Sequence, residues 1–393
     1  MRCEHCGRET PEGHYCAYCG AHLAAANTRY HPQQRRHAFA ANPSESVYHP
    51  SVVTTLFPHL APERSHQLRW ILGGAALIVF LIAFGRLVPV AIVLAALLVP
   101  LLYLYYFYEV AIFEDEPLAV LAGTFLAGLV LGAAFSAALY KPILDQSTAS
   151  LLPGRGPTQT YIVLTGVVFP MASLLLMLVG PVVLLITRRK FDEVLDGLAF
   201  GAASGLGFAT AQSIVFSWLL ITGPLQRPGQ AFSWALPVVR IALLQPLLYA
   251  SAAGLVCASL WLARDPQTPR RSMGLLATPL VAVLLALILL VAPALASVLF
   301  GGDVLNLVYY AAALVLLLLL VRVVLHVGLV EKAQAIGHGG TMRCPHCFHE
   351  VGDTPFCPHC GLAMRSTSNR ARPGTPPASA PSSSPQASGG AAQ

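Results

Sequence analysis

The sequence predicts an all-α polytopic membrane bundle, of about eight transmembrane helices, that carries two small cysteine-rich modules. Three observations support this fold class. Of the 393 residues, 55% are hydrophobic and only 11% are charged, and eight of the nine cysteines fall into one duplicated pattern. Because a soluble domain has about 25% charged residues, a soluble globular protein is excluded.

Eight apolar stretches are long enough to cross a hydrocarbon layer of roughly 30 Å, which takes about 20 helical residues. They cover approximately 70–88, 90–108, 118–140, 160–187, 197–222, 235–262, 274–299 and 304–327. Between the first two, Gly85, Arg86 and Pro89 fit either a tight hairpin or a kink in a membrane-surface segment. Residues 1–69 are polar, so we expect no signal peptide before the first span.

Lys and Arg are concentrated in the segments that would lie on one side of the membrane if the chain had eight spans. These segments precede the first span, follow the fourth and sixth spans, and follow the last one. The opposite loops hold only Arg86, Lys141, Arg155 and Arg227. Since cytoplasmic loops carry the excess of positive charge, both termini are expected in the cytoplasm. The net charge of +6 therefore indicates topology and gives no strong sign of nucleic-acid binding.

The cysteine-rich modules both have the spacing C-x2-C-x9-C-x2-C. Their cysteines are Cys3, Cys6, Cys16 and Cys19, and Cys344, Cys347, Cys357 and Cys360. Two Cys-x-x-Cys knuckles can complete a tetrahedral four-thiolate shell, and thiolate softness favours Zn2+. The strings CEHCG, CAYCG, CPHCF and CPHCG resemble zinc-ribbon knuckles. Two disulfides per module would require extracellular termini, against the charge asymmetry.

A closed four-thiolate shell has no open coordination position, so we expect two structural zinc sites that act as binding modules and not as catalytic centres. His5, His346 and His359 lie inside knuckles and are expected to be exposed turn residues. Cys257 stands alone in an apolar span, where a small buried packing residue is expected.

These features divide the chain into six parts. They are a zinc ribbon at 1–22, a polar linker at 23–68, the transmembrane bundle at 69–330, a linker at 331–341, a second ribbon at 342–364 and a disordered tail at 365–393. The tail is rich in Ser, Pro, Ala and Gly, a composition that cannot order itself.

The fifth span carries Gly197, Gly201 and Gly205 at four-residue intervals, so the three share one helix face. Such a face lets a second membrane helix approach to backbone contact. Asp196 precedes them and is expected to cap this helix, its carboxylate meeting unpaired N–H groups.

The string that contains these glycines closely resembles the second motif of the PrsW family of membrane-embedded peptidases, related to the CAAX-prenyl endopeptidases. The matching residues are Phe191, Asp196, Gly197, Gly201, Gly205, Gly207, Phe208 and Ala209, and Glu114-Asp115-Glu116-Pro117-Leu118 resembles the family's opening motif. The resemblance covers about 103–300. It implies a membrane-embedded bundle in a prokaryotic plasma membrane, of a kind that clips anti-sigma factors.

The chain departs from the family wherever the resemblance would place a catalytic residue. Ser173 and Leu174 stand at the positions of two glutamates, and Gln212-Ser213 replaces a Glu-Asn pair. Leu248 and Tyr249 occupy the region of the first histidine. The later His-x-x-Trp-Asn element, expected near 293–297, is absent.

A count of ionisable residues also indicates that the spans lack catalytic groups. All glutamates lie outside the spans, Asp196 and Asp303 lie at span edges, and His326 is near the cytoplasmic end of the last span. An intramembrane hydrolase needs such groups inside the bundle. The sequence therefore predicts a pseudoprotease that binds a membrane or cytoplasmic protein partner without cutting it.

Two alternatives stay open. An active intramembrane metallopeptidase could use Asp196, Glu193 or His326 at the rim to cleave single-pass regulators, and a purely structural protein could anchor the ribbons. Gln212 is expected to hydrogen-bond across helices, with binding of an extended peptide backbone as the alternative.

Overall fold

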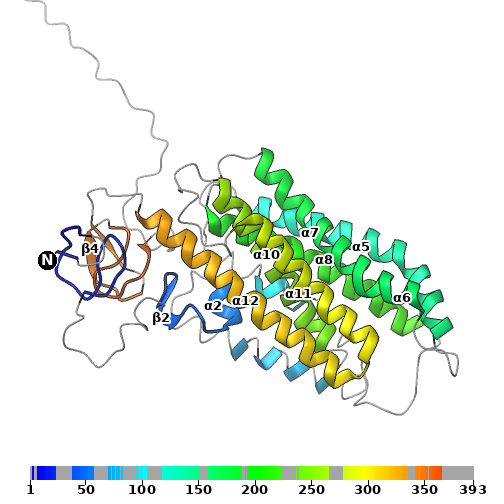
Figure 1. Cartoon of the computed structure of the whole chain (residues 1–393). Coiled ribbons are helices and arrows are strands. Elements are labelled where there is room, and N and C mark those ends of the chain that lie inside the picture. Colours follow the sequence, from blue (N-terminus) through cyan, green and yellow to red (C-terminus); the bar gives the residue numbers. More distant parts are fainter. Residues whose placement is uncertain are drawn as a thin grey trace, which may run out of the picture.

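The structure is a computed structural model in which six long helical segments form a bundle, with both ribbons at one end (Figure 1). It describes residues 2–3, 7–23, 38–56, 117–150, 158–187, 191, 193–222, 236, 239–264, 278–334, 341–344, 346–352 and 354–364, with short pieces between 70 and 103. The predicted tail at 365–393 lies outside the described residues, as does most of the predicted linker on either side of 38–56.

Six segments are long and apolar enough to cross a membrane, within the part of the chain that the structure describes. They are α5 (Pro117–Ser150), α6–η1–α7 (Gln159–Val163, Leu164–Val168, Phe169–Thr187), α8 (Val194–Thr222), η2–α10 (Arg240–Leu244, Gln245–Arg264), α11 (Pro279–Phe300) and α12 (Asp303–Gln334). They match the last six predicted spans, and the chain is an integral membrane protein. The first two predicted spans lie largely outside the described residues, so the total of eight stays a prediction.

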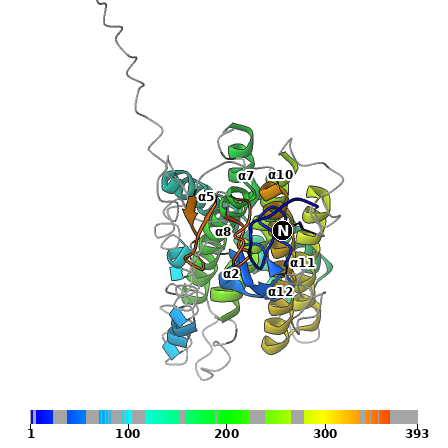
Figure 2. The same cartoon turned by 90° about the vertical axis from the view of Figure 1, so that its left-hand side faces the viewer.

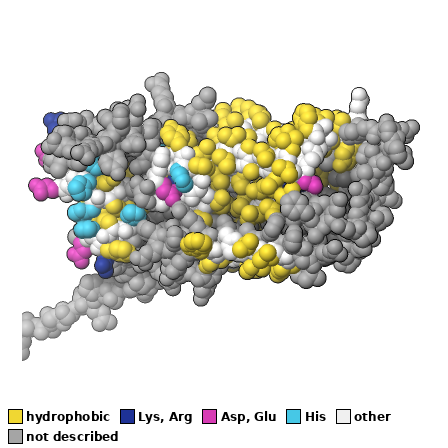
Figure 3. Space-filling model, turned by 90° about the horizontal axis from the view of Figure 1, so that it is seen from below, with side chains coloured by type: hydrophobic (Ala, Val, Ile, Leu, Met, Phe, Trp, Pro, Cys, Tyr) yellow, Lys and Arg dark blue, Asp and Glu magenta, His cyan; other side chains and the backbone are white. Residues whose placement is uncertain are grey.

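Helices α8 and α10 form the centre of the bundle. In their apolar stretches 89% of the residues are buried, against 22% in α11. The outer helices instead expose large apolar side chains such as Leu175 and Ile288. Figure 3 shows apolar side chains over the described face of the bundle, with histidines and charges gathered at the ribbon end. This distribution fits a bundle whose outer surface faces lipid.

Close approach of α8 and α10 depends on the three glycines. A Cβ added at Gly197, Gly201 or Gly205 would lie 2.5 to 2.8 Å from a backbone oxygen of α10. Those oxygens belong to Cys257, Ala253 and Tyr249, one turn apart, so the helices run antiparallel in backbone contact. Gly207, on another face of α8, meets α5 in the same way. Small residues therefore fix α8 between two neighbours, as expected where lipid supplies no hydrophobic driving force.

Two membrane helices contain a π-helical turn just before a proline. The N–H groups of Phe169 and Gln245 donate to carbonyls five residues back, in front of Pro170 and Pro246. A proline lacks the N–H that would continue the α-helical ladder and crowds the preceding turn. π-Turns of this kind often lie beside functional sites because they redirect side chains.

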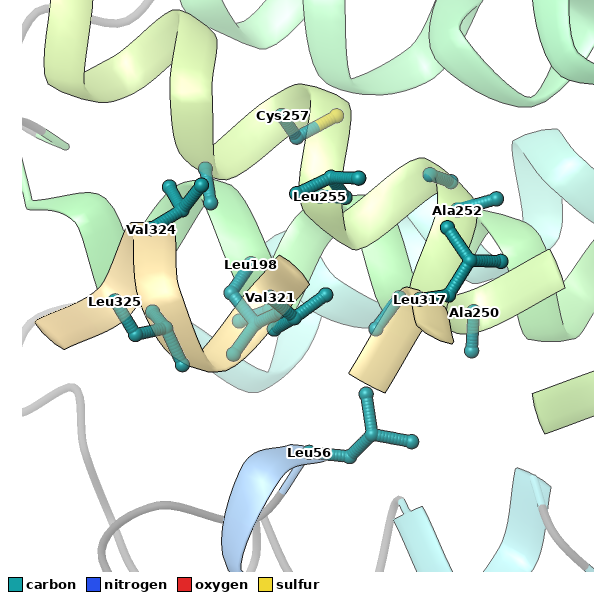
Figure 4. Close-up of a cluster of buried hydrophobic side chains, with 14 of the residues drawn as sticks. Leu56, Leu198, Ala250, Ala252, Leu255, Cys257, Leu317, Val321, Val324 and Leu325 are labelled. Carbon is teal, nitrogen blue, oxygen red and sulfur yellow. The ribbon is translucent and has the colours of Figure 1, made fainter. Parts of the chain in front are cut away.

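Residues 38–56, here called the docked segment, are folded although they lie in the predicted polar linker. Strands β1 (Ala38–Phe39) and β2 (Asn42–Ser46) pair antiparallel and lead to the short helix α2 (Val52–Leu56). Leu56 points toward Leu317 of α12 in the buried apolar cluster of Figure 4. The linker prediction missed this segment because its order comes from contacts with α12 and not from its own sequence.

The C-terminal ribbon contains the small hairpin of β3 (Thr341–Arg343) and β4 (Glu350–Gly352). The N-terminal ribbon lies beside it, and both stand in front of the bundle when that end faces the viewer (Figure 2). Both ends of the described chain therefore meet on one side of the bundle.

Candidate functional site

A polar cluster lies inside the bundle where α7, α8 and α10 meet. It consists of Ser173 from α7, Gln212 from α8, and Gln245 and Tyr249 from α10. Gln245 Nε2 donates to Gln212 Oε1, and the Tyr249 hydroxyl lies beside the side chains of Ser173 and both glutamines. Ser173 and Gln212 are at most 1% exposed, so bulk water does not solvate them.

Two polar atoms of this cluster have unused hydrogen-bonding capacity. Ser173 Oγ and Gln212 Nε2 form no hydrogen bond of ordinary geometry with the described residues. An unsatisfied buried polar group costs about 1–3 kcal/mol, so such groups favour an added polar partner. A buried water or a peptide group with both a donor and an acceptor would satisfy them.

The cluster brings together three of the five positions at which the sequence analysis expects a departure from the family pattern: Ser173, Gln212 and Tyr249. The other two do not join it. Leu174 is fully buried among apolar side chains, and Ser213 Oγ donates to Ile241 O at 3.4 Å. Sequence reasoning missed Gln245, whose one signal was its place directly before Pro246.

Neutral amides and hydroxyls make up this cluster, so its chemistry is limited to hydrogen bonding. Arg240 lies over the ring of Tyr310, with 5.3 Å from the guanidinium carbon to the ring centroid. The side chains of the polar cluster include no carboxylate or imidazole, the groups that bind a metal ion or act as the general base for a metal-bound water. The arrangement can hold a polar group by hydrogen bonding.

At the rim of the bundle, the Asp196 carboxylate and the Glu193 backbone cap the start of α8. Asp196 Oδ2 accepts from the N–H of Glu193 at 3.1 Å, while Glu193 O accepts from the N–H groups of Asp196 and Gly197. The expected capping role of Asp196 is confirmed. The reciprocal pair fixes the start of α8, which holds the packing glycines in register.

His326 of α12 also has a structural contact. Its Nδ1 accepts from the N–H of Ala40 at 3.2 Å, which ties α12 to the docked segment. Among the described residues, the groups of three or more side chains that could hold a metal are both made of cysteines.

An ion pair buried beside α12 was missed by the sequence analysis. Arg322 is 0% exposed, and both terminal nitrogens contact Glu45 Oε2 at 3.1 Å. The same guanidinium donates to Thr54 Oγ1 and Ser46 O and lies over the ring of Phe39 at 4.3 Å. The signal was an arginine inside the last apolar stretch, because a cation at such a place requires a partner.

The C-terminal cysteines form a compact four-sulfur cluster. The Sγ atoms of Cys344 and Cys360 are 3.7 Å apart, and those of Cys347 and Cys357 are 3.6 Å apart. Four sulfurs at about 2.3 Å from a central ion would lie about 3.8 Å from one another, so the cluster fits one tetrahedral ion. A disulfide needs about 2.0 Å, and all four cysteines are free.

The N-terminal cysteines follow the same plan. Cys3, Cys16 and Cys19 lie close enough to share one ion, with 3.7 Å between the Sγ atoms of Cys3 and Cys19. Cys6, the fourth predicted ligand, lies outside the described residues.

All four knuckles turn in one way. In each, the residue after the second cysteine donates its N–H to the carbonyl of the first, as Gly361 does to Cys357 at 2.9 Å. This residue has a positive φ in every knuckle, and it is a glycine except at Phe348, whose φ is 61°. A left-handed conformation suits glycine and strains a residue with a Cβ.

The thiols of the C-terminal cluster share their protons unequally. Hydrogen bonds from Cys357 and Cys360 lower the pKa of Cys344 to about 2. The contact with Cys344 raises the pKa of Cys357 to about 12 and also raises that of Cys360. Four adjacent thiolates repel one another without a cation, so metal binding would displace the remaining protons.

The histidines within the C-terminal knuckles do not match the expectation of exposed turn residues. His346 and His359 are half-buried, and the ring of His359 stacks on that of exposed His349 with 4.4 Å between centroids. His5 lies outside the described residues.

Comparison with known families identifies a match over the bundle. The family described as PrsW family intramembrane metalloprotease matches residues 116–327, which contain the polar cluster and both rim sites but neither ribbon. No curated protein and no solved structure matches the chain.

Proposed function

Because the chain belongs to the PrsW family of intramembrane metalloproteases, we propose that it is a member without catalytic activity that binds a membrane protein partner and leaves it uncut. The observation that carries this proposal is the polar cluster. Three positions at which the family pattern would place catalytic residues meet there as Ser173, Gln212 and Tyr249.

The chemistry of these side chains supports binding over hydrolysis. A divalent metal in the interior of a membrane protein needs carboxylate or imidazole ligands, because neutral amides do not offset its charge. Ser173 Oγ and Gln212 Nε2, which form no hydrogen bond of ordinary geometry with the described residues, can instead hydrogen-bond an exposed peptide group of an unwound partner segment. Such contacts recognise a backbone and break no bond.

A partner with one membrane span suits this site, since the family is associated with clipping single-pass anti-sigma factors. The alternative function, an active peptidase, is favoured only by the family match itself. It would have to recruit Glu193, Asp196 or His326, and the side chains of Asp196 and His326 already cap α8 and contact the docked segment.

Co-expression with a panel of tagged single-pass membrane proteins tests the proposal. We expect a full-length partner to co-purify with the wild-type chain and to be lost from Gln212→Leu, with Gly123→Ala in the open face of α5 as a matched control. Chelator-sensitive fragments of the partner would contradict it.

We further propose that each cysteine cluster binds one Zn2+. Purified protein should contain about two zinc ions per chain, one per four-thiolate shell. Replacing Cys16 and Cys357 by Ser should remove both, while Cys257→Ser, in the interior of α10, should retain them. Equal metal content in the two variants would rule the assignment out.

Both termini are proposed to be cytoplasmic, in the plasma membrane of a prokaryote. The Lys and Arg asymmetry supports this orientation, and so does the contact between the two ribbons, which places both ends of the chain on one side. A reporter that works only in the cytoplasm should be active when it is fused after Gln393. Activity of a reporter that works only outside the cell would reverse the topology.

A further inference from the structure

The two ribbons contact each other through a reciprocal set of backbone hydrogen bonds. The N–H of Tyr15 donates to Pro358 O at 2.9 Å, and the N–H of Phe356 donates to Ala17 O at 2.9 Å. In each ribbon the donor comes just before the third cysteine and the acceptor just after it. The two modules therefore pair about a local pseudo-twofold axis, like an isologous dimer within one chain.

Side chains repeat the same symmetry. The ring of Phe356 covers Gly20, and the ring of Tyr15 covers Gly361, so that a Cβ at either glycine would lie within 3.0 Å of the opposite ring. Gly13 approaches Pro358 so closely that a Cβ there would be 2.5 Å from Pro358 O. This degree of fit indicates a specific interface and not two modules that happen to be neighbours.

The C-terminal ribbon is also joined to the docked segment. The N–H of Ala363 donates to Ala40 O at 3.0 Å, and the N–H of Ala40 donates to His326 Nδ1 at 3.2 Å. Phe356 and Ala363 belong to the same buried apolar cluster as Leu325 of α12. A continuous path of contacts thus runs from the metal clusters to the bundle.

We propose that the paired ribbons are a metal-dependent latch that holds the docked segment on α12. A module of about 22 residues cannot bury enough apolar surface to fold without its metal. Loss of metal from either cluster would therefore dissolve the pair, remove the Ala363–Ala40 contact and release residues 38–56. Release would uncover Arg322 and the apolar surface under Leu56. This inference does not depend on whether the bundle binds or cuts a partner.

Hydrogen exchange of the full-length protein in detergent tests the latch. The zinc-loaded protein and the protein treated with excess chelator are compared at the amides of residues 38–56. Chelation should speed exchange there by about tenfold or more, with no comparable change in the centre of α8 and α10. Unchanged exchange in the docked segment after complete zinc removal would overturn the proposal.

A second arm separates the ribbon interface from metal binding. Gly13→Leu blocks the approach to Pro358 without touching a cysteine, and Tyr15→Ala removes an interface ring without adding bulk. Both variants should keep their zinc and still show fast exchange at 38–56. Glu12→Ala, at the exposed neighbour of Gly13, is the control and should behave as wild type. If zinc-loaded Gly13→Leu and Tyr15→Ala both protect 38–56 as wild type does, the ribbon pair is not the latch.

Discussion

Gly201 has no room for a side chain, since a Cβ there would be 2.5 Å from the carbonyl oxygen of Ala253. Gly201→Leu should therefore force α8 away from α10 and destabilise the bundle by about 1–3 kcal/mol or more, the cost of overpacking a core. Gly123→Leu is the matched control, because a Cβ at Gly123 meets nothing within 4 Å. Unfolding in detergent measures both, and equal stabilities would show that the glycine contact is not tight.

Phe348 is the one described non-glycine residue with a positive φ. Phe348→Gly should relieve a left-handed strain of about 1–2 kcal/mol and make the C-terminal cluster harder to strip of metal. Phe348→Ala keeps the strain and removes the ring that lies 5.6 Å from Arg343, so it separates the two effects. Competition with a chelator measures zinc retention. Weaker retention in the glycine variant would show that ring contacts outweigh backbone strain.

At the scale of single residues, the features that depend on spacing could be predicted from the sequence alone. Cysteine intervals and glycine intervals are local patterns, so they revealed the cysteine clusters and the packing face of α8. Gln245 and Arg322 could not be assigned roles, because each depends on a partner from a distant part of the chain. The half-burial of His346 likewise depends on how its knuckle packs in the folded protein, which the local sequence of the knuckle does not determine.

The docked segment is an element that a buried ion pair helps to hold on α12. Removing one member of such a pair leaves the other charge uncompensated and typically costs about 3–5 kcal/mol. Arg322→Leu should therefore weaken the attachment of residues 38–56 to α12. The loss of free energy should be smaller than this full cost, because the Glu45 side chain is 14% exposed and can regain water. Hydrogen exchange at 38–56 gives the readout.

The double variant Arg322→Leu with Glu45→Leu is the control for this element. Since replacing both members removes the uncompensated charge, the double variant should be more stable than Arg322→Leu alone. Purely additive losses would mean that the pair carries no coupling and that the apolar contacts of Leu56 hold the segment.

At the scale of elements, length and hydropathy predicted the six described spans well, since crossing a membrane demands both. The docked segment was predicted as linker because its few apolar residues cannot form a core alone. Its order comes from α12, which supplies Arg322, His326 and the apolar surface near Leu317. Order of this kind belongs to the tertiary structure and leaves no periodic signal.

Across the whole molecule, the match to the peptidase family favours an active enzyme and the polar cluster favours the proposed binding role, and the rim residues bear on this choice. The Asp196 carboxylate accepts from the backbone N–H of Glu193 at the start of α8, and His326 accepts a hydrogen bond from Ala40. A metallopeptidase would need such groups to converge on one ion beside the scissile bond. In the described residues, only cysteines form clusters able to hold a metal.

We therefore expect no peptide hydrolysis from the bundle. When the chain is co-expressed with single-pass membrane proteins, substrate fragments should be no more abundant than with Glu193→Gln, Asp196→Asn or His326→Ala. The ribbons provide an internal check, since the Cys16→Ser and Cys357→Ser double variant should lack the proposed ribbon metals and leaves the rim intact. Cleavage that this double variant retains, and that a chelator and any one rim substitution abolish, would establish a catalytic metal at the rim. The polar cluster would then be a structural contact between helices, and the chain an active peptidase with relocated ligands.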